Sequence, residues 1–398
     1  MRRIDLKKAQ AARPNTIRDI NRQIVLNYVR EREPISRASI ARETALQRST
    51  VSEIVETLKA EGLVEEIGAG VSTGGRRPTM LRLRTAGPIA IGVAITPTFT
   101  TVATSDLAGR VLEQEQVATE PDPTRMLASV IEVVRKLSDR NKGLIEGVGV
   151  SIPGLVDPGT GRAIFVPYFK WRDFAVADTI RNATGLAVTI DNDANAVALA
   201  ELWFGRPEVS DARDFILVLV AEGVGTGIIF DGQVYRGERG AAGEFGHMIV
   251  GADAPVPCSC GSYDCWEAFA SERAAQARYV GLCNDNQASM TPDFPTLVDR
   301  ALAGEQNAQR ALEEMAHYVG IGISNLIVGF SPEAVVVGGE ITRAWSLVEN
   351  ALTEKIERSV RRGLPSARIL ASTLGEQPTL RGALSLVLAS KFASAFAA

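Results

Sequence analysis

One pattern of strands occurs twice in this sequence, and it constrains the fold more than any other feature. The pattern is an apolar strand, a loop, a second strand, a turn that contains Asp and Gly, and a third strand. It occupies residues 89–112 and returns at residues 215–235. Because similar segments that recur along one chain indicate repeated structural units, we expect two related lobes.

Further apolar segments and helical patterns follow each copy of this pattern. Buried strands are expected at residues 148–152, 188–190 and 334–337, and helices at residues 124–137 and 308–327. Strands that alternate with helices are typical of an α/β architecture. The sequence therefore predicts two α/β lobes with a cleft between them.

The residues ahead of this repeat carry three short helical patterns. Apolar residues recur at helical spacing from Ile17 to Tyr28, a second helix is expected at residues 36–43, and residues 44–46 form a turn. The third helix carries four apolar residues on one face, which are Val51, Ile54, Val55 and Leu58. Three short helices with a tight turn before the third form the helix-turn-helix plan.

The third helix of this plan enters the major groove of DNA with its N-terminal end. We expect residues 50–53, Thr-Val-Ser-Glu, to begin the helix as a capping box and Gly62 to end it. Arg and Gln bind guanine and adenine edges, whereas Ser and Thr more often bind phosphates. The predicted DNA contacts of this helix are Gln47, Arg48, Ser49, Thr50 and Ser52.

A wing is expected directly after the third helix. Residues 63–67 and 80–84 form two strands, joined by the loop Ser-Thr-Gly-Gly-Arg-Arg-Pro at residues 72–78. Two adjacent arginines on such a tip suit the narrow, electronegative minor groove, so Arg76 and Arg77 complete the predicted DNA contacts. Two other interpretations stay open, namely a helical subdomain that contacts protein and a loop that is only a flexible linker.

These patterns together predict two domains. Residues 1–85 form a winged helix-turn-helix, mainly α-helical, and residues 86–398 form the two-lobed α/β domain. We place the first lobe at about residues 86–200 and the second at about residues 201–380, with a C-terminal helix that returns to the first lobe.

Charge is distributed unevenly between these two domains. Residues 1–85 hold 17 Lys and Arg against 10 Asp and Glu, a net charge of +7, and the remaining residues hold 26 against 37, a net charge of -11. A basic head on an acidic body favours a polyanionic partner for the head alone. The alternative is a solvated surface with scattered arginines.

Composition points to a globular protein that stays in the cytoplasm. Hydrophobic residues make up 45% of the chain and charged residues 23%, which argues against disorder. No apolar run reaches the ~18 residues that cross a bilayer. The first residues carry Asp5, Lys7 and Lys8 where a signal peptide needs an apolar stretch, so we expect no membrane partner.

Three of the four cysteines lie within eight residues, and one of the two histidines precedes them. Such clustering favours a metal site over a disulfide framework. The candidate ligands are His247, Cys258, Cys260 and Cys265. One nitrogen and three sulfur ligands suit tetrahedral Zn2+ with every position filled by protein, which is typical of a structural site. The alternative is a reduced cysteine-rich loop without metal.

Three segments of the body resemble the ROK family (repressors, open reading frames, kinases). They are Gly243–His247 with Cys258–Glu267, Asp191–Ala196, and Ser151–Asp157. The resemblance runs from about residue 15 to the end, with Asp264 where the family has Gly. It implies an actin-like, ribonuclease-H-like ATPase fold, and it includes the winged head that the family's repressors carry and its kinases lack.

The resemblance also implies a sugar site. The residues that match the family's sugar-binding positions are Gly154, Asn192, Asp193, Glu244, His247 and Glu267. Asp193 takes the position of the kinase base, and His247 would use its second ring nitrogen. Our hypothesis is that zinc fixes Glu244 and Glu267 at the cleft wall. Tyr168 stands where family members often have Asn, which predicts altered sugar specificity.

The phosphate side departs from the kinases of this family. Residues 94–98 are Ala-Ile-Thr-Pro-Thr where the kinases have Asp-x-Gly-Gly-Thr, so a carboxylate and two glycines are missing. Because neutralising phosphate charge is most of phosphoryl-transfer catalysis, we expect neither ATP binding nor catalysis, with Asp193 a vestigial base. The glycine-rich loop at residues 223–227 is intact, and Gly338–Gly339 matches the adenosine side, but both are weak signals.

The sequence thus predicts a sugar-responsive DNA-binding regulator of carbohydrate genes, most simply a repressor. A monosaccharide or sugar phosphate in the cleft would change the spacing of paired heads on double-stranded operator DNA, in a homodimer or homotetramer. Two alternatives stay open: a sugar kinase with an appended head, and a regulator that a protein partner controls. The sequence leaves open the identity of the sugar, its phosphorylation, the operator and the sign of the response.

Overall fold

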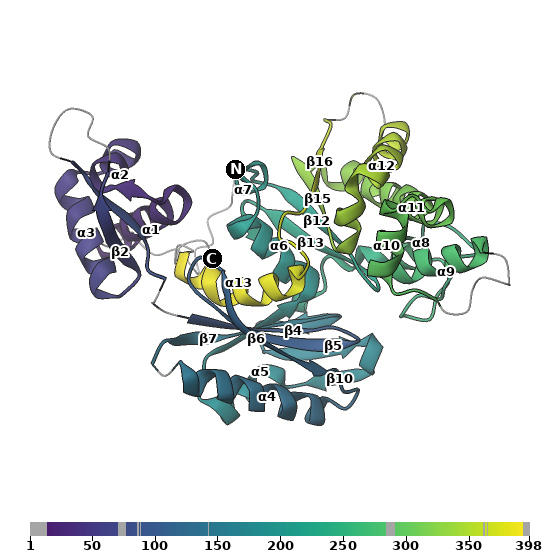
Figure 1. The fold of residues 1–398 in the computed structure, drawn as a ribbon, viewed down its shortest axis with the longest axis horizontal. Coiled ribbons are helices and arrows are strands. Elements are labelled where there is room, and N and C mark those ends of the chain that lie inside the picture. The colour runs from purple at the N-terminus through teal and green to yellow at the C-terminus, as the bar shows by residue number, and fades with distance from the viewer. Residues whose placement is uncertain are drawn as a thin grey trace. The chain divides into compact units, whose positions relative to one another are not determined.

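The computed structural model describes residues 14–70, 77–85, 87, 89–141, 143–283, 291–360, 363 and 365–392. The chain divides into two compact units (Figure 1). The first contains residues 1–89, 105–110 and 388–398, and the second contains residues 90–104 and 111–387.

The first unit contains a winged helix-turn-helix. Its helices are α1 (Pro14–Arg32), α2 (Arg37–Thr44) and α3 (Arg48–Ala60), and its sheet has the order β1 (Ile35–Ser36), β3 (Thr79–Leu83), β2 (Val64–Ala69). The four residues predicted for the buried face of the third helix are all buried, together with Val25 and Val29 of α1 and Leu81 of β3. This packing confirms the predicted helical stripe, and β2 pairs antiparallel with β3 as expected of a wing.

The predicted capping box at the start of the third helix is wrong. Helix α3 begins at Arg48, and its N-cap is Gln47, whose carbonyl accepts the Val51 N–H at 3.0 Å. The left-handed conformation of Ala45 (φ 58°) ends α2 and turns the chain, so helical backbone resumes before Thr50 is reached. Either start buries the same apolar stripe, which is why the sequence pattern did not separate them.

The predicted end of the third helix is confirmed. Gly62 has φ +75°, and the N–H groups of Gly62 and Leu63 reach back to the carbonyls of Lys59 (3.0 Å) and Leu58 (2.9 Å). This pair of bonds is the Schellman arrangement, which favours glycine because the residue after the helix must be left-handed.

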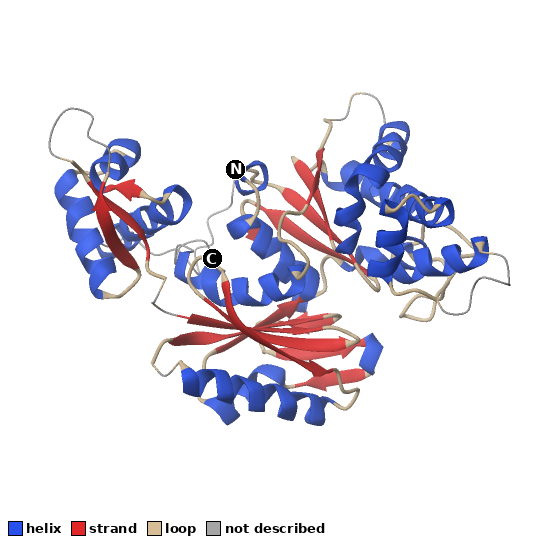
Figure 2. Cartoon of the chain, in the orientation of Figure 1, coloured by secondary structure: helices blue, strands red, loops and turns tan. Residues whose placement is uncertain are grey.

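The second unit has two five-stranded sheets with the same strand order (Figure 2). The first has the order β11 (Val188–Asn192), β7 (Ile145–Ile152), β4 (Ile89–Ile95), β5 (Phe99–Ser105), β6 (Val111–Ala118). The second has the order β16 (Arg368–Ala371), β15 (Ala334–Gly338), β12 (Phe215–Val220), β13 (Val224–Phe230), β14 (Gln233–Val234). Numbered by appearance within each lobe, both orders are 5-4-1-2-3, so the predicted repeat is confirmed.

Helices cover both faces of these sheets. On the first sheet, α4 (Pro123–Arg140) and α5 (Val176–Thr184) lie on one face and α13 (Pro378–Phe392) on the other (Figure 1). Ser151 of β7 donates its hydroxyl to the carbonyl of Thr379 in α13 at 3.1 Å. On the second sheet, α6 (Asp193–Phe204) packs on one face and α11 (Gln306–Phe330) on the other.

The remaining elements are short or lie outside the two sheets. Strands β8 (Leu155–Asp157), β9 (Arg162–Val166) and β10 (Trp171–Phe174) form a small antiparallel sheet. The other helices are α7 (Pro207–Ser210), α8 (Trp266–Ala270), α9 (Glu272–Leu282), α10 (Phe294–Leu302) and α12 (Trp345–Ser359). Four short 3-10 helices are η1 (Pro167–Phe169), η2 (Glu238–Gly240), η3 (Glu244–His247) and η4 (Glu340–Ala344).

The glycine-rich segment at residues 223–227 is mostly strand and not the loop that the sequence predicted. Val224 pairs with Val220 across a tight turn, and β13 begins there. A Cβ at Gly227 would lie 2.4 Å from the Ala194 carbonyl oxygen, and one at Gly225 would lie 2.9 Å from the Ala194 Cβ. These glycines therefore allow α6 to pack closely on β13, a structural requirement that needs no phosphate.

Candidate functional site

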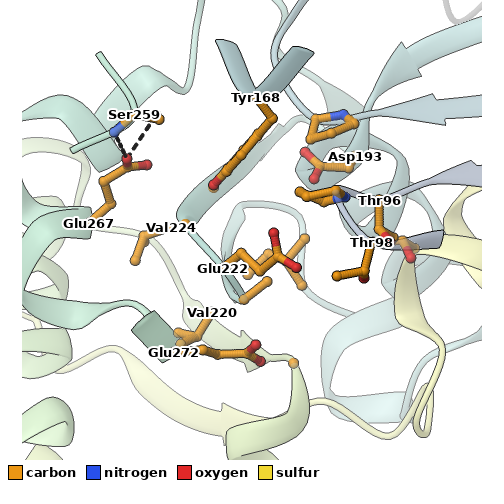
Figure 3. A pocket seen from close by; sticks show the side chains of 18 of the residues that line it. Thr96, Thr98, Tyr168, Asp193, Val220, Glu222, Val224, Ser259, Glu267 and Glu272 are labelled. Carbon is orange, nitrogen blue, oxygen red and sulfur yellow. Dashed lines mark hydrogen bonds between the residues drawn. The ribbon is translucent and has the colours of Figure 1, made fainter. Parts of the chain in front are cut away.

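A cavity of about 580 Å³ lies in the second unit, lined by residues of both lobes (Figure 3). The β4–β5 turn, the start of α6, the β12–β13 turn, η3 and the starts of α8 and α9 all contribute to its wall. The structure brings all six predicted sugar-side residues to this one wall, which are Gly154, Asn192, Asp193, Glu244, His247 and Glu267.

The junction of β11 and α6 orients Asn192. Its side-chain oxygen accepts the Asn195 N–H at 3.1 Å, which caps α6, and its amide nitrogen donates to the Gly154 carbonyl at 3.0 Å. One side chain thus ties the helix start to the loop after β7. An N-cap of this kind stabilises a helix by about 1 kcal/mol.

A buried ion pair lies directly behind this junction. Asp191 is 2% exposed, and its Oδ2 accepts from Arg236 Nε at 2.8 Å and Nη2 at 2.7 Å. Burial raises the pKa of Asp191, and the guanidinium opposes that shift. The sequence motif included Asp191 without giving it a role, and the structure shows that it anchors the end of β11.

Asp193 is the next residue and faces the cavity. Its Oδ1 accepts the Ala194 N–H at 2.8 Å. Burial raises the pKa of Asp193 to about 7, and the nearby Glu244 carboxylate contributes in the same direction. The group therefore holds a proton for part of the time at neutral pH, so it can accept or donate a hydrogen bond to a ligand hydroxyl.

The ring of His247 faces two different groups. Its Nδ1 lies 3.2 Å from Cys258 Sγ, and its Nε2 lies 3.7 Å from Glu244 Oε2 at the cavity wall. Burial raises the pKa of Glu244, an effect that the imidazole opposes. One ring nitrogen is thus directed to the cysteines while the other faces the cavity side.

Four residues form a group that can hold a metal ion. The ligand atoms of His247, Cys258, Cys260 and Cys265 all lie within 4.8 Å of one another, and the sulfurs of Cys260 and Cys265 are 3.6 Å apart. A tetrahedral ion with bonds of about 2.3 Å to sulfur has an S–S edge of about 3.8 Å. The separation of the sulfurs fits such an ion.

Glu267 connects this cysteine loop with the cavity. It is 5% exposed, and its Oε1 accepts the N–H and the hydroxyl of Ser259, both at 2.8 Å (Figure 3). Ser259 lies between two of the cysteines, so the conformation of the loop fixes the carboxylate. A Cβ at Gly223 would come within 2.8 Å of Glu267 Oε2 and of the Tyr168 hydroxyl, so a larger residue here would displace the ends of these side chains.

Tyr168 of η1 directs its ring into the cavity, between Glu267 and Asp193 (Figure 3). Burial raises the pKa of its hydroxyl, and the Glu267 charge adds to the shift. Within the described residues the hydroxyl has no hydrogen-bond partner, so its donor can serve a ligand.

The β4–β5 turn satisfies its own polar groups. The Thr96 hydroxyl donates to the Phe99 carbonyl at 2.6 Å and accepts the Phe99 N–H at 3.3 Å, and the Thr96 N–H donates to the same carbonyl at 3.2 Å. Pro97 offers no N–H, and the Ala94 side chain is buried and apolar. This turn therefore closes on itself and presents few donors to an anion.

The start of α3 presents exposed polar residues on the first unit. Gln47, Arg48 and Ser49 are exposed, and Thr50 and Ser52 are half-buried. Several other cations of this unit are paired with acids, as in Arg37–Glu56 (2.6 Å) and Arg82–Glu65 (2.6 Å), whereas no acid pairs with Arg48 in the described part of the chain. Arg77 is exposed, and Arg76 lies outside the described residues.

Two family models match the chain. The model described as ROK family matches residues 90–390, and one described as winged helix-turn-helix DNA-binding matches residues 18–65. The chain belongs to the ROK family. The predicted fold, a winged helix-turn-helix followed by an actin-like α/β domain, is thereby confirmed, as is the resemblance to ROK regulators.

Two curated ROK relatives are repressors by name. The xylose repressor of Bacillus subtilis (strain 168) is 31% identical over 378 residues, which cover 94% of this chain and 96% of the relative. The N-acetylglucosamine repressor of Escherichia coli O6:H1 is 28% identical over 375 residues, 91% of each chain. Both alignments span the head and the body.

Solved ROK structures include a regulator and a kinase. A ROK family transcriptional regulator, homologous to the E. coli MLC protein, superposes with a TM-score of 0.76 at 25% identity over 95% of this chain and 97% of that one. A ROK glucokinase from Streptomyces griseus, solved with glucose and AMPPNP, has a TM-score of 0.67 at 31% identity over 75% of this chain and 98% of that one.

Within the residues that the structure describes, no helix combines the length and apolar character that crossing a membrane requires.

The cavity wall also includes five acids that the sequence patterns did not single out, which are Glu222, Glu272, Asp293, Glu340 and Glu376. They come from separate loops and helix starts, so no local spacing could have grouped them.

Proposed function

We propose that this protein is a transcription regulator that binds operator DNA through its winged head and a sugar in the cavity of its body. The observation that carries this proposal is the assembly of one amide and four ionisable side chains on a single cavity wall, in a chain whose other unit is a DNA-binding fold. Sugars offer many hydroxyls, which need donors and acceptors held at fixed positions. Since the two curated relatives are named as repressors, repression is the sign we propose.

We propose Zn2+ as the ion held by His247, Cys258, Cys260 and Cys265. Three sulfurs and one imidazole nitrogen are typical ligands of structural zinc, which would supply a rigid cross-link and no chemistry. His247 and Ser259 belong to the same loop system, and they face Glu244 and Glu267 respectively. A fixed loop would therefore hold both carboxylates in position for ligand hydroxyls.

The remaining sugar contacts would come from the α6 junction and the aromatic ring. Asn192 and Asp193 present an amide and a carboxyl group, and Gly154 contributes the backbone next to them. Tyr168 adds an aromatic face, against which the C–H groups of a sugar ring can pack. The two relatives are named for different sugars, so their names do not identify the sugar that this chain binds.

DNA contacts would come from the start of α3 and from the wing. The exposed, unpaired Arg48 and the neighbouring Gln47 suit base edges in the major groove, while Ser49, Thr50 and Ser52 suit phosphates. Arg76 and Arg77 would enter the minor groove. Two heads on one operator require a symmetric dimer, or a tetramer built from two dimers.

We do not propose kinase activity. The donors of Thr96 and Phe99 bond within the β4–β5 turn, and the glycines of β13 allow the close packing of α6. The glucokinase relative and the partly protonated Asp193 keep the kinase as the alternative that an experiment must address. Sugar would act by binding the two conformations of the regulator with different affinity, which is the only way a ligand can shift such an equilibrium.

The test is to select DNA from a random pool with the purified, zinc-loaded protein and then to titrate that DNA with sugars present. We expect at least one sugar to change the DNA affinity about 5- to 150-fold, the usual range of allosteric coupling. Thermal unfolding with the same sugars should show a rise of the midpoint. If no sugar changes DNA affinity, the sugar-response proposal is wrong, and ATP turnover with a sugar would instead establish the kinase.

A further inference from the structure

The cavity wall carries charges of one sign. Among its described residues no lysine or arginine occurs, and eight carboxylic acids do, namely Asp193, Glu222, Glu244, Glu267, Glu272, Asp293, Glu340 and Glu376. A wall of low-dielectric surface with one sign of charge concentrates its field in the cavity. A ligand therefore meets several acids and no lysine or arginine on the described wall.

Two of these acids are among those that form no ion pair in the described chain. Glu222 lies in the β12–β13 turn, and Glu272 begins α9 (Figure 3). Neither forms an ion pair or a side-chain hydrogen bond with any residue that the structure describes. Glu340, by contrast, pairs with Arg343 at 2.5 Å.

Glu272 is half-buried, and it lines the cavity. Burial raises its pKa to about 8, and the charges of Glu222 and Glu340 add to this shift. Burial likewise raises the pKa of Glu222. The charge of Arg273 opposes the shift of Glu222. A raised pKa of an acid means that negative charge is disfavoured at this part of the wall, and Glu272 itself is mostly protonated at neutral pH.

The guanidinium of Arg273 lies close to this part of the wall. Arg273 Nε donates to the Glu222 carbonyl oxygen at 2.8 Å, and its Nη2 lies 3.8 Å from Glu267 Oε1. The guanidinium is therefore held between a backbone oxygen and a carboxylate that is already bonded to Ser259. Arg273 is not among the residues that line the cavity, and its Nη2 has no hydrogen-bond partner in the described chain.

We infer that Glu222 and Glu272 make the site selective for unphosphorylated sugars, and that they exclude sugar phosphates and sugar acids. This inference rests on the proposed function, since it specifies the ligand class of the same cavity. A phosphate ester carries up to two negative charges, and phosphate sites are normally built from arginine, lysine or free backbone N–H groups. This cavity offers carboxylates in their place.

The experiment compares matched pairs by calorimetry on the full-length, zinc-loaded protein. The probes are D-xylose, D-glucose and N-acetyl-D-glucosamine, each with its terminal phosphate ester. For any pair that binds, we expect the free sugar to bind at least about 100-fold more tightly than its phosphate ester. This affinity ratio should fall as salt rises from ~0.02 to ~0.5 M. The salt series uses wild-type protein only, so it does not depend on how variants fold.

Two variants and a control locate the effect. The double variant Glu222→Gln, Glu272→Gln should lower the affinity ratio about 10-fold. The phosphate ester should bind more tightly, while the affinity for the free sugar stays nearly unchanged. Glu313 is an exposed acid of α11 that does not line the cavity, so Glu313→Gln should leave the affinity ratio unchanged. Equal or tighter binding of a phosphate ester by wild-type protein overturns the inference while leaving the sugar-response proposal intact. If no probe, phosphorylated or free, binds or changes DNA affinity, both fail.

Discussion

The cavity wall has acids at two ends with different surroundings, one end around Asn192 and Glu267 and the other around Glu222 and Glu272. At the first end, which is proposed to bind sugar and is called the sugar end, the Glu267 carboxylate accepts two hydrogen bonds from Ser259. Both the oxygen and the nitrogen of the Asn192 amide are hydrogen-bonded. At the other end, Glu222 and Glu272 have no bonded partner in the described chain, and the β4–β5 turn is closed by Thr96. On the proposals above, the first end would receive a sugar and the second would disfavour phosphate.

If the proposed function holds, this difference is what separates a sugar sensor from a sugar kinase of the same fold. A kinase needs both ends, because the sugar must meet a phosphoryl group held by donors and a metal ion. A sensor needs only the sugar end and two conformations that bind the sugar unequally.

The largest effect should follow from removing the cross-link at the sugar end. Cys258→Ser takes away one of four candidate metal ligands and should abolish stoichiometric zinc, because a three-ligand site binds far more weakly. We expect a loss of at least about 3 kcal/mol of stability and of sugar binding. Elemental analysis and thermal unfolding measure both changes.

The matched control for this variant is Cys283→Ser. Cys283 is half-buried and lies outside the cluster, so zinc content should stay at one per chain. A Cys258→Ser protein that keeps its zinc and its sugar affinity would show that the cysteine loop is not a metal site.

The next effect comes from the sugar end without disturbing its cross-link. Glu244→Gln keeps the shape of the side chain but replaces a charged acceptor near His247 Nε2. Because charge-assisted hydrogen bonds are about twice as strong as neutral ones, we expect sugar affinity to fall roughly 10- to 100-fold. DNA affinity without sugar should not change, which titration of the selected DNA measures. Equal losses of sugar and DNA affinity would point to misfolding, and Glu313→Gln provides the reference.

The opposite end is tested by reopening the turn. Thr96→Gly with Pro97→Gly restores the two glycines of the kinase pattern and removes the hydroxyl bonded to Phe99. We expect a loss of roughly 1–2 kcal/mol, since glycine makes the unfolded chain more flexible. ATP–Mg2+ should still fail to bind, because Glu222 and Glu272 remain. Calorimetric ATP binding by this variant would show that the turn alone blocks the nucleotide.

The sequence carried the parts of this comparison that depend on periodicity or on rare residue types. Alternating apolar segments predicted the repeated sheets, and the scarcity of Cys and His made their cluster conspicuous. The start of α3 was misplaced because the left-handed Ala45 is a conformational choice without a clear residue signal. Glu272 was missed because the residues around it come from segments that meet only in the folded chain.

The smallest effect distinguishes the two ends by stability and pH. The pKa of Glu272 is raised to about 8 from an ordinary value near 4.5, so the folded state loses stability as pH rises through this interval. Glu272→Gln removes that loss, and the variant should gain at least about 1 kcal/mol over wild type at pH 8.5 and clearly less at pH 5.5. Glu267→Gln should lose stability at both pH values, because an amide nitrogen or a weaker oxygen would then face the two donors of Ser259. Thermal unfolding at the two pH values measures both variants. A Glu272→Gln protein less stable than wild type at pH 8.5 would mean that this carboxylate has a partner after all, and the two ends would then be alike.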